Sequence, residues 1–163
     1  MAKLKGAKKI NKIINEFTEK NFGIHAEMGC EFQAFCGDRL INYTFVMTSK
    51  SINYFKADAE TRFPEVQADI FLWCLMHEIG HCMTDNMWSF EEQTYFDAQK
   101  EMLAYIERDC DRYSWYHVLP DEYMATKFAG EYMKAHPKKM TKFWNKLVPA
   151  IMNFYEKNNL MED

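Results

Sequence analysis

The chain has 163 residues, 48% of them apolar and 16% aromatic, which is enough for the core of one domain and excludes a disordered protein. The formal net charge is −4, and residues 57–122 hold fifteen acidic side chains against four basic ones, which argues against nucleic-acid binding there. No apolar run is long enough to span a membrane, and the charged N-terminus lacks the apolar stretch of a signal peptide. We therefore expect one domain over residues 1–163, with neither nucleic acid nor a membrane as partner.

The first predicted element is an amphipathic helix. Its apolar stripe recurs at the spacing i, i+3, i+4 and i+7 and consists of Ile10, Ile13, Ile14 and Phe17. The helix is expected to end before Gly23. From residue 24 to 55 the composition becomes aromatic and β-branched, with a turn at 36–39, and predicts a mostly antiparallel sheet of about three strands, of which 43–47 is the clearest.

A second helix is predicted from Pro64, a residue suited to a first helical turn, to about Thr84. Ser89 and Glu92 then form the capping-box pattern of a third helix, expected to extend towards Leu119 and to stop at Pro120. Two more helices are predicted at 121–135 and 138–157. The fold class is therefore α+β, mostly helical, with a small antiparallel sheet before the second helix.

The cysteines form an odd set without Cys-x-x-Cys spacing, which favours free thiols in a reducing cytoplasm over a disulfide framework. They are Cys30, Cys36, Cys74, Cys82 and Cys110.

The segment His77-Glu78-Ile79-Gly80-His81 places two imidazoles four residues apart. On an α-helix such residues lie about 40° apart around the axis, so both rings can reach one ion. Glu78 lies about 100° from His77, where its carboxylate can act on a water instead of binding the ion. The pattern predicts a Zn²⁺ site with His77 and His81 as ligands and Glu78 as the catalytic residue. The alternative is a pair of core histidines satisfied by hydrogen bonds.

A catalytic zinc ion usually has three protein ligands, so one is still missing. We predict Glu107 on the following helix, with Asp111 one turn later accepting the outer N–H of a ligand histidine, and Asp109 as the alternative ligand. Gly80 predicts a close helix crossing, which would be that of the helix bearing Glu107. Candidate donors to a developing oxyanion are Tyr113, His117, Tyr116 and Tyr95.

These residues resemble the ImmA/IrrE family of zincin (gluzincin) metallopeptidases. That family's pattern is Glu-x-x-Ala-Asp/Asn-x-Phe-Ala-x-x-Leu-Leu-x-Pro after the His-Glu-x-x-His helix. Its places are filled here by Glu107, Cys110, Asp111, Tyr113, Ser114 and Pro120. The match is specific at the histidines, Glu78, Glu107 and Asp111, is loose elsewhere, and covers residues 64–120.

The resemblance implies a zincin-like fold and an intracellular protease, often associated with phage or mobile elements, that cleaves a regulatory protein. The expected function is zinc-dependent hydrolysis of peptide bonds, in which Glu78 takes the proton of a zinc-bound water and passes it to the leaving amine.

Three alternatives remain open. A peptide deformylase would use Cys30 as the third ligand, although the chain lacks that family's Gly-x-Gly-x-Ala-Ala-x-Gln segment. A catalytically silent scaffold would act by binding or inhibiting a protein. A structural zinc would need a fourth protein ligand such as Cys82 or Cys110; Cys82, about 100° round from His81, is expected in the core.

Overall fold

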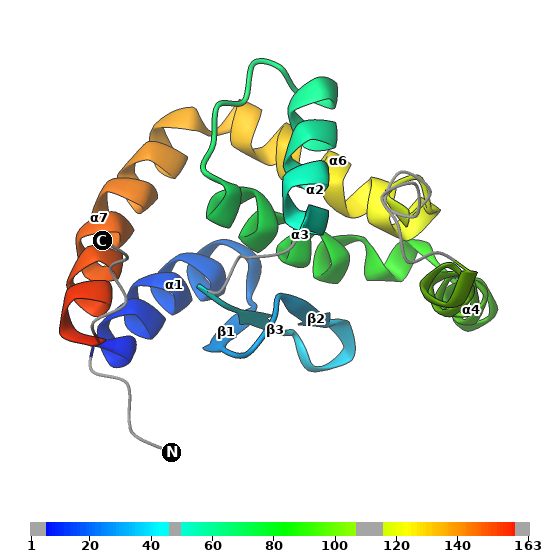
Figure 1. Ribbon diagram of the computed structural model, residues 1–163, viewed down its shortest axis with the longest axis horizontal. Coiled ribbons are helices and arrows are strands. Elements are labelled where there is room, and N and C mark those ends of the chain that lie inside the picture. Colours follow the sequence, from blue (N-terminus) through cyan, green and yellow to red (C-terminus); the bar gives the residue numbers. More distant parts are fainter. Residues whose placement is uncertain (1–5, 46–49, 107–115, 159–163) are drawn as a thin grey trace.

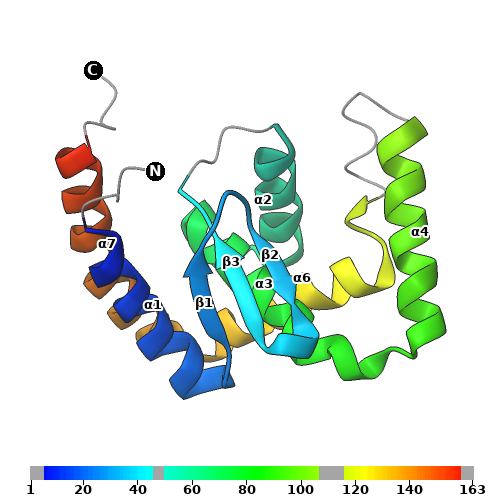
Figure 2. The same cartoon turned by 90° about the horizontal axis from the view of Figure 1, so that it is seen from below.

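The apolar stripe near the N-terminus forms the predicted helix, α1 (Ala7–Phe22), and buries Ile10, Ile13, Ile14 and Phe17. Gly23 ends it in the left-handed conformation (φ 66°), with its N–H bonded to the carbonyl of Glu19 at 3.0 Å. In this computed structural model, which describes residues 6–45, 50–106 and 116–158, α1 lies beside the last helix, α7 (Pro137–Asn158) (Figures 1 and 2). The stacked rings of Phe17 and Phe143, 4.0 Å apart, join the two helices.

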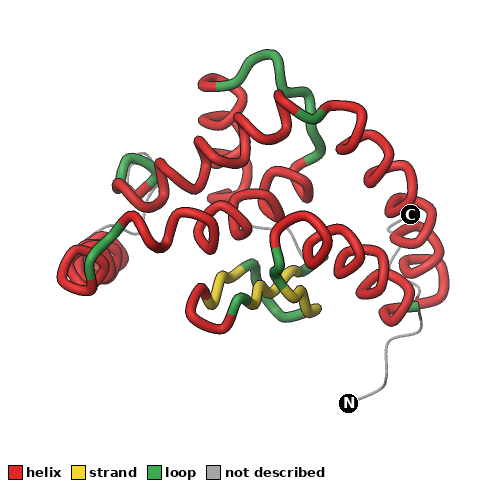
Figure 3. Tube along the Cα trace, turned by 180° about the vertical axis from the view of Figure 1, so that it is seen from behind, coloured by secondary structure: helices red, strands yellow, loops and turns green. Residues whose placement is uncertain are grey.

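The strands form a mixed sheet and not the mostly antiparallel one that was predicted. They are β1 (His25–Met28), β2 (Gln33–Phe35) and β3 (Leu40–Tyr43), in the order β1-β3-β2. β2 turns back through the 3-10 turn η1 (Cys36–Asp38) to pair antiparallel with β3. β3 lies between its two partners and runs parallel to β1. Because the strand order is β1-β3-β2, β2 is an edge strand of the sheet. Figure 3 shows this small sheet against one side of the helices.

Two predicted boundaries differ around the sheet and the second helix. Of the expected strand 43–47 only Tyr43 belongs to β3, and 46–49 lie outside the described residues. The prediction for Pro64 was wrong: a helix that was not predicted, α2 (Lys50–Arg62), ends before this proline. The next helix, α3 (Ile70–Thr84), begins only after Asp69, whose carboxylate accepts a hydrogen bond from the Phe71 N–H at 2.8 Å. A proline disfavours helix in the residue before it, and Asp69 supplies the cap, so these two residues decide both boundaries.

The capping box is confirmed. Ser89 N–H donates to the Glu92 carboxylate at 2.8 Å, and Glu92 N–H donates to the Ser89 hydroxyl at 3.2 Å, at the start of α4 (Phe90–Ile106). The short turn η2 (Asp85–Met87) links α3 to this helix. The predicted continuation of this helix towards Leu119 falls mostly on residues 107–115, which lie outside the described residues. Pro120, predicted as a stop, is the first residue of the next described helix, α6 (Pro120–Ala135). α6 and α7 match the two predicted C-terminal helices to within a residue at each end.

The core is built around α3, whose Trp73, Leu75, Met76 and Ile79 are fully buried. Among the described elements α3 and α6 share the largest contact. They cross at Gly80, where an added Cβ would lie 2.4 Å from the backbone oxygen of Ala125. The close crossing predicted from Gly80 is confirmed, and the crossing helix is α6. No helix in the described parts of the chain combines the length and apolarity needed to cross a bilayer.

Replacing Gly80 by alanine tests this crossing. Overpacking costs roughly 1–3 kcal/mol, more than the about 1 kcal/mol that alanine gains over glycine in helix propensity, so we expect a lower free energy of unfolding. Chemical denaturation measures it. The control is Gly37→Ala, because a Cβ at Gly37 meets nothing within 4 Å. Equal stability of the two variants would contradict the close crossing.

Candidate metal centre

α3 carries the predicted histidine pair on its buried face. His77 is 6% exposed and His81 half-buried, and their Nε2 atoms lie 3.1 Å apart. Two imidazole nitrogens at this distance repel if both are unprotonated, unless a donor or a cation lies between them. The two rings can therefore either share a proton in a hydrogen bond or bind one cation between them.

α6 brings a carboxylate to the same point. Glu122 is 3% exposed and lies one turn before Ala125, where α6 touches Gly80. Its Oε2 lies 3.0 Å from His77 Nε2, and its Oε1 lies 3.5 Å from His81 Nε2. Ligand atoms around a tetrahedral zinc, about 2.0–2.1 Å from the metal, are about 3.3 Å apart. The three residues therefore have the spacing of a three-point metal cradle, and this is the cluster of the described residues that could hold an ion.

Thr126 sets the orientation of the first histidine. Its hydroxyl, 1% exposed, lies 3.0 Å from His77 Nδ1. When Nδ1–H donates to that hydroxyl, Nε2 is left unprotonated and free to bind a metal. Thr126 is four residues after Glu122, so one face of α6 supplies both the carboxylate and the group that holds His77.

A lysine also contacts the carboxylate of Glu122. Lys100 of α4 places its Nζ 2.6 Å from Glu122 Oε1 and 2.5 Å from Asp121 Oδ2. Burial alone would raise the pKa of Glu122, but the adjacent His81 and His77 outweigh it and hold the pKa well below its ordinary value. Burial acts to lower the pKa of Lys100, and Glu122 and Asp121 outweigh it and raise that pKa. The site is thus a buried network of paired charges.

Glu78 lies beside the cradle and not within it. Burial raises the pKa of its carboxyl to about 7, nearby Glu122 adds to the rise, and His77, Lys100 and the N–H of Ala34 oppose it. Ala34 belongs to the edge strand β2, so the carboxylate is held between α3 and the sheet. A carboxylate with a pKa near 7 is suited to taking and returning a proton at neutral pH.

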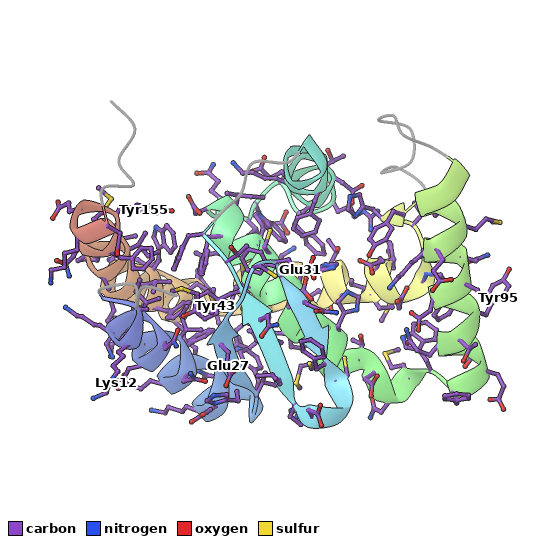
Figure 4. All side chains as sticks on the ribbon, turned by 60° about the horizontal axis from the view of Figure 1, so that its bottom comes forward. Lys12, Glu27, Glu31, Tyr43, Tyr95 and Tyr155 are labelled. Carbon is purple, nitrogen blue, oxygen red and sulfur yellow. The ribbon has the colours of Figure 1, made fainter. Side chains whose placement is uncertain are left out.

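The cradle opens into a cleft of about 850 Å³. Gln33 and Ala34 of β2 line one side of the cleft, and Gln93, Asp97 and Lys100 of α4 line another. Figure 4 shows the side chains between these two walls, with Glu31 at the end of the sheet.

His117 also lines this cleft, at 8% exposure, and neither of its ring nitrogens has a hydrogen-bond partner in the described part of the chain. Burial lowers its pKa, with His77 adding to the effect, which favours the neutral form of the ring. Its ring packs 5.6 Å from that of Phe55. A buried neutral imidazole with both nitrogens unpaired can donate to, or accept from, a group bound in the cleft.

The structure brings together only part of the predicted site. His77, Glu78 and His81 share α3, and Tyr116 and His117 line the cleft. Tyr95 is 61% exposed and points outward from α4 (Figure 4). The predicted ligand Glu107, its alternative Asp109, its supporting residue Asp111 and the donor Tyr113 lie outside the described residues, as does Cys110.

None of the described cysteines joins the cradle. Cys30 is an exposed thiol on the cleft lining, outside the cluster that could share an ion, and Cys82 is buried in the core as predicted. The described donor set is therefore two nitrogens and one oxygen.

Sequence reasoning missed Glu122, Thr126 and Lys100. A signal for the first two is present. Residues 122, 125, 126, 129, 130 and 133 recur at helical spacing and are otherwise small or apolar, so Glu122 and Thr126 are polar exceptions on a core-facing stripe. The signal is weak, because an acidic residue in the first turn after a proline is also ordinary helix capping. Nothing in the local sequence distinguishes Lys100 from a solvated lysine.

Comparison of the chain with protein-family models, with curated proteins and with solved structures returned no match.

Replacing one carboxylate at a time identifies the third zinc ligand. We expect Glu122→Gln to weaken zinc binding by more than the about 10–100-fold caused by changes outside the ligand shell, because an amide oxygen is a poorer, uncharged ligand. Elemental analysis and competition with a chelator give the affinity. Glu107→Gln is the matched comparison and is expected to keep its zinc. If Glu107→Gln loses zinc and Glu122→Gln keeps it, the third ligand is Glu107, as the sequence predicted.

The role of Thr126 is tested by a pair of variants. Thr126→Val removes the hydroxyl at nearly constant volume, and we expect zinc affinity to fall about 10–100-fold because His77 loses its hydrogen-bond partner. Thr126→Ser keeps the hydroxyl and should bind zinc like the parent protein. Equal weakening in both variants would contradict a specific role of the hydrogen bond, because Thr126→Ser keeps the hydroxyl.

Proposed function

We propose that this protein is a zinc-dependent metallopeptidase, similar to the ImmA/IrrE zincins, that hydrolyses peptide bonds of an intracellular regulatory protein. The observation that carries the proposal is the buried cradle of His77, His81 and Glu122 beside Glu78, open to a cleft. We place the protein in the cytoplasm because its described cysteines are free thiols, as in a reducing compartment.

The donor set supports zinc as the metal. Two imidazole nitrogens and one carboxylate oxygen are the ligands of a class of catalytic zinc sites, and they leave the fourth tetrahedral position to water or substrate. A closed structural site would need a fourth protein ligand, and the cluster of described residues contains three. Zinc in such a site supplies a Lewis acid and a water acidic enough to react at neutral pH.

Glu78 does the proton transfer in this mechanism. Its carboxylate takes the proton from the attacking water and then delivers it to the nitrogen of the departing amine. The N–H of Ala34 and the packing of α3 against the sheet hold the carboxylate in place. Its raised pKa makes the protonated form accessible, which the second step requires.

His117 is the candidate best placed to stabilise the oxyanion, because it is buried in the cleft lining and its nitrogens have no described partner. Tyr116 is less free, since its hydroxyl is bonded to Glu122, whose proximity adds to burial in raising the tyrosine pKa. An N–H donor held in a buried cleft stabilises developing negative charge more strongly than one in water.

Replacing Glu78 tests hydrolysis separately from binding. We expect Glu78→Gln to retain one equivalent of zinc and to lose at least about 100-fold in rate, because the amide cannot accept a proton from water. The measurement is cleavage of a proteome-derived peptide library by the zinc-loaded protein, followed by mass spectrometry.

Equal cleavage by the parent protein and Glu78→Gln would overturn the mechanism. If neither cleaves any peptide and both act equally in the cell, the function is protein binding on a silent scaffold. Loss of zinc from Cys30→Ser would instead favour a deformylase-type ligand set.

A further inference from the structure

The lining of the cleft is strongly acidic. Among the described residues that line it, the only lysine or arginine is Lys100. The carboxylates are Glu31, Glu78, Asp85, Asp97, Asp121 and Glu122. A cleft lined by charges of one sign concentrates its field, attracts ligands of the opposite sign and speeds their binding.

The single lysine cannot serve an acidic substrate. Its Nζ already lies within 2.6 Å of both Asp121 and Glu122, so its charge is matched within the protein. Glu78 and Glu122 belong to the proposed catalytic centre, where a divalent ion would balance them. Three carboxylates of the lining, Glu31, Asp85 and Asp97, have no ion pair within the described ranges.

Two of these carboxylates lie at the α4 side of the cleft. Asp85 begins η2 and Asp97 lies on α4. The ring of Trp88, the residue that follows η2, lies 5.1 Å from the ring of Phe96 on α4. Asp97 accepts one hydrogen bond from the Gln93 amide at 3.2 Å, which leaves its second oxygen available. Trp88 also lines the cleft, and an indole beside carboxylates is a favourable surface for a cation.

An independent observation points to a ligand that donates hydrogen bonds. Asp121 is 3% exposed and lines the cleft, and its Oδ1 has no hydrogen-bond partner among the described residues, although Lys100 binds its Oδ2. A buried carboxylate oxygen without a donor is costly, and a donor from a bound ligand removes that cost.

We propose that the cleft selects peptide segments that carry lysine or arginine, with Asp85 and Asp97 binding the basic side chains and Asp121 accepting a hydrogen bond from the bound segment. This inference rests on the proposed peptidase function and adds the class of its substrate. Arginine and lysine carry several donors each, which suits a surface on which carboxylate oxygens remain without a donor.

Peptide binding without turnover tests the inference. The probes are two fluorescein-labelled, C-terminally amidated peptides of equal length and otherwise identical sequence, one with several lysines and one with glutamates at those positions. Their affinities for zinc-loaded Glu78→Gln protein are measured by fluorescence anisotropy at low ionic strength, where exposed charges are least screened. We expect the lysine peptide to bind at least about tenfold more tightly.

A pair of double variants locates the selectivity. Asp85→Asn with Asp97→Asn should weaken binding of the lysine peptide about fivefold, the effect of losing two exposed ion pairs. Glu91→Gln with Glu101→Gln removes the same charge from exposed positions of α4 outside the cleft, and should change binding less than about twofold. Equal affinity of the two peptides, or equal effects of the two double variants, would overturn the proposal. Absence of hydrolysis by the parent protein would remove the peptidase function and leave this comparison of affinities unaffected.

Discussion

The close crossing of α3 and α6 is the constraint on which the site depends. Gly80 lets the backbone of α6 approach at Ala125. Glu122 lies about one turn before that contact, and Thr126 lies directly after it. The approach brings a carboxylate within 3.0–3.5 Å of both histidines and a hydroxyl within 3.0 Å of His77. A Cβ at position 80 would lie 2.4 Å from the Ala125 oxygen, closer than the 3.4–4 Å of ordinary van der Waals contact. The helices would have to move apart, which would lengthen the distances between Glu122 and the histidines.

The charges gathered at this crossing explain why the site is a network and not a single triad. Carboxylates taken out of water are costly unless they are paired, and Glu122 and Asp121 are each 3% exposed. The histidines approach Glu122 from α3, while Lys100 of α4 bridges Glu122 and Asp121. Glu78 and His117 lie at the edge of this network, where they face the cleft and have the freedom to act on a bound molecule. The proposed chemistry requires both kinds of group: charged ligands that are held by partners, and groups such as Glu78 and His117 that can act on a molecule bound in the cleft.

Several elements could be predicted because their causes are local. Spacing and capping within a few residues account for them. These are the stripe of α1, the left-handed Gly23 after it, the capping box of α4 and the two C-terminal helices. The sequence-based predictions were wrong where two local signals competed, or where the structure depends on pairing between strands that are distant along the chain. Pro64 suits a helix start, but Asp69 caps the helix better, and the parallel pairing of β1 with β3 depends on which strand enters the middle of the sheet.

The amino-acid sequence by itself determined the half of the site that one helix carries. Two histidines four residues apart with Glu78 beside the first must share one side of α3, because helical periodicity leaves them no other arrangement. Only the tertiary structure decided which acid meets them. Glu122 follows His81 by forty-one positions along the chain, and its approach depends on the packing of two helices over small residues, which no local pattern specifies.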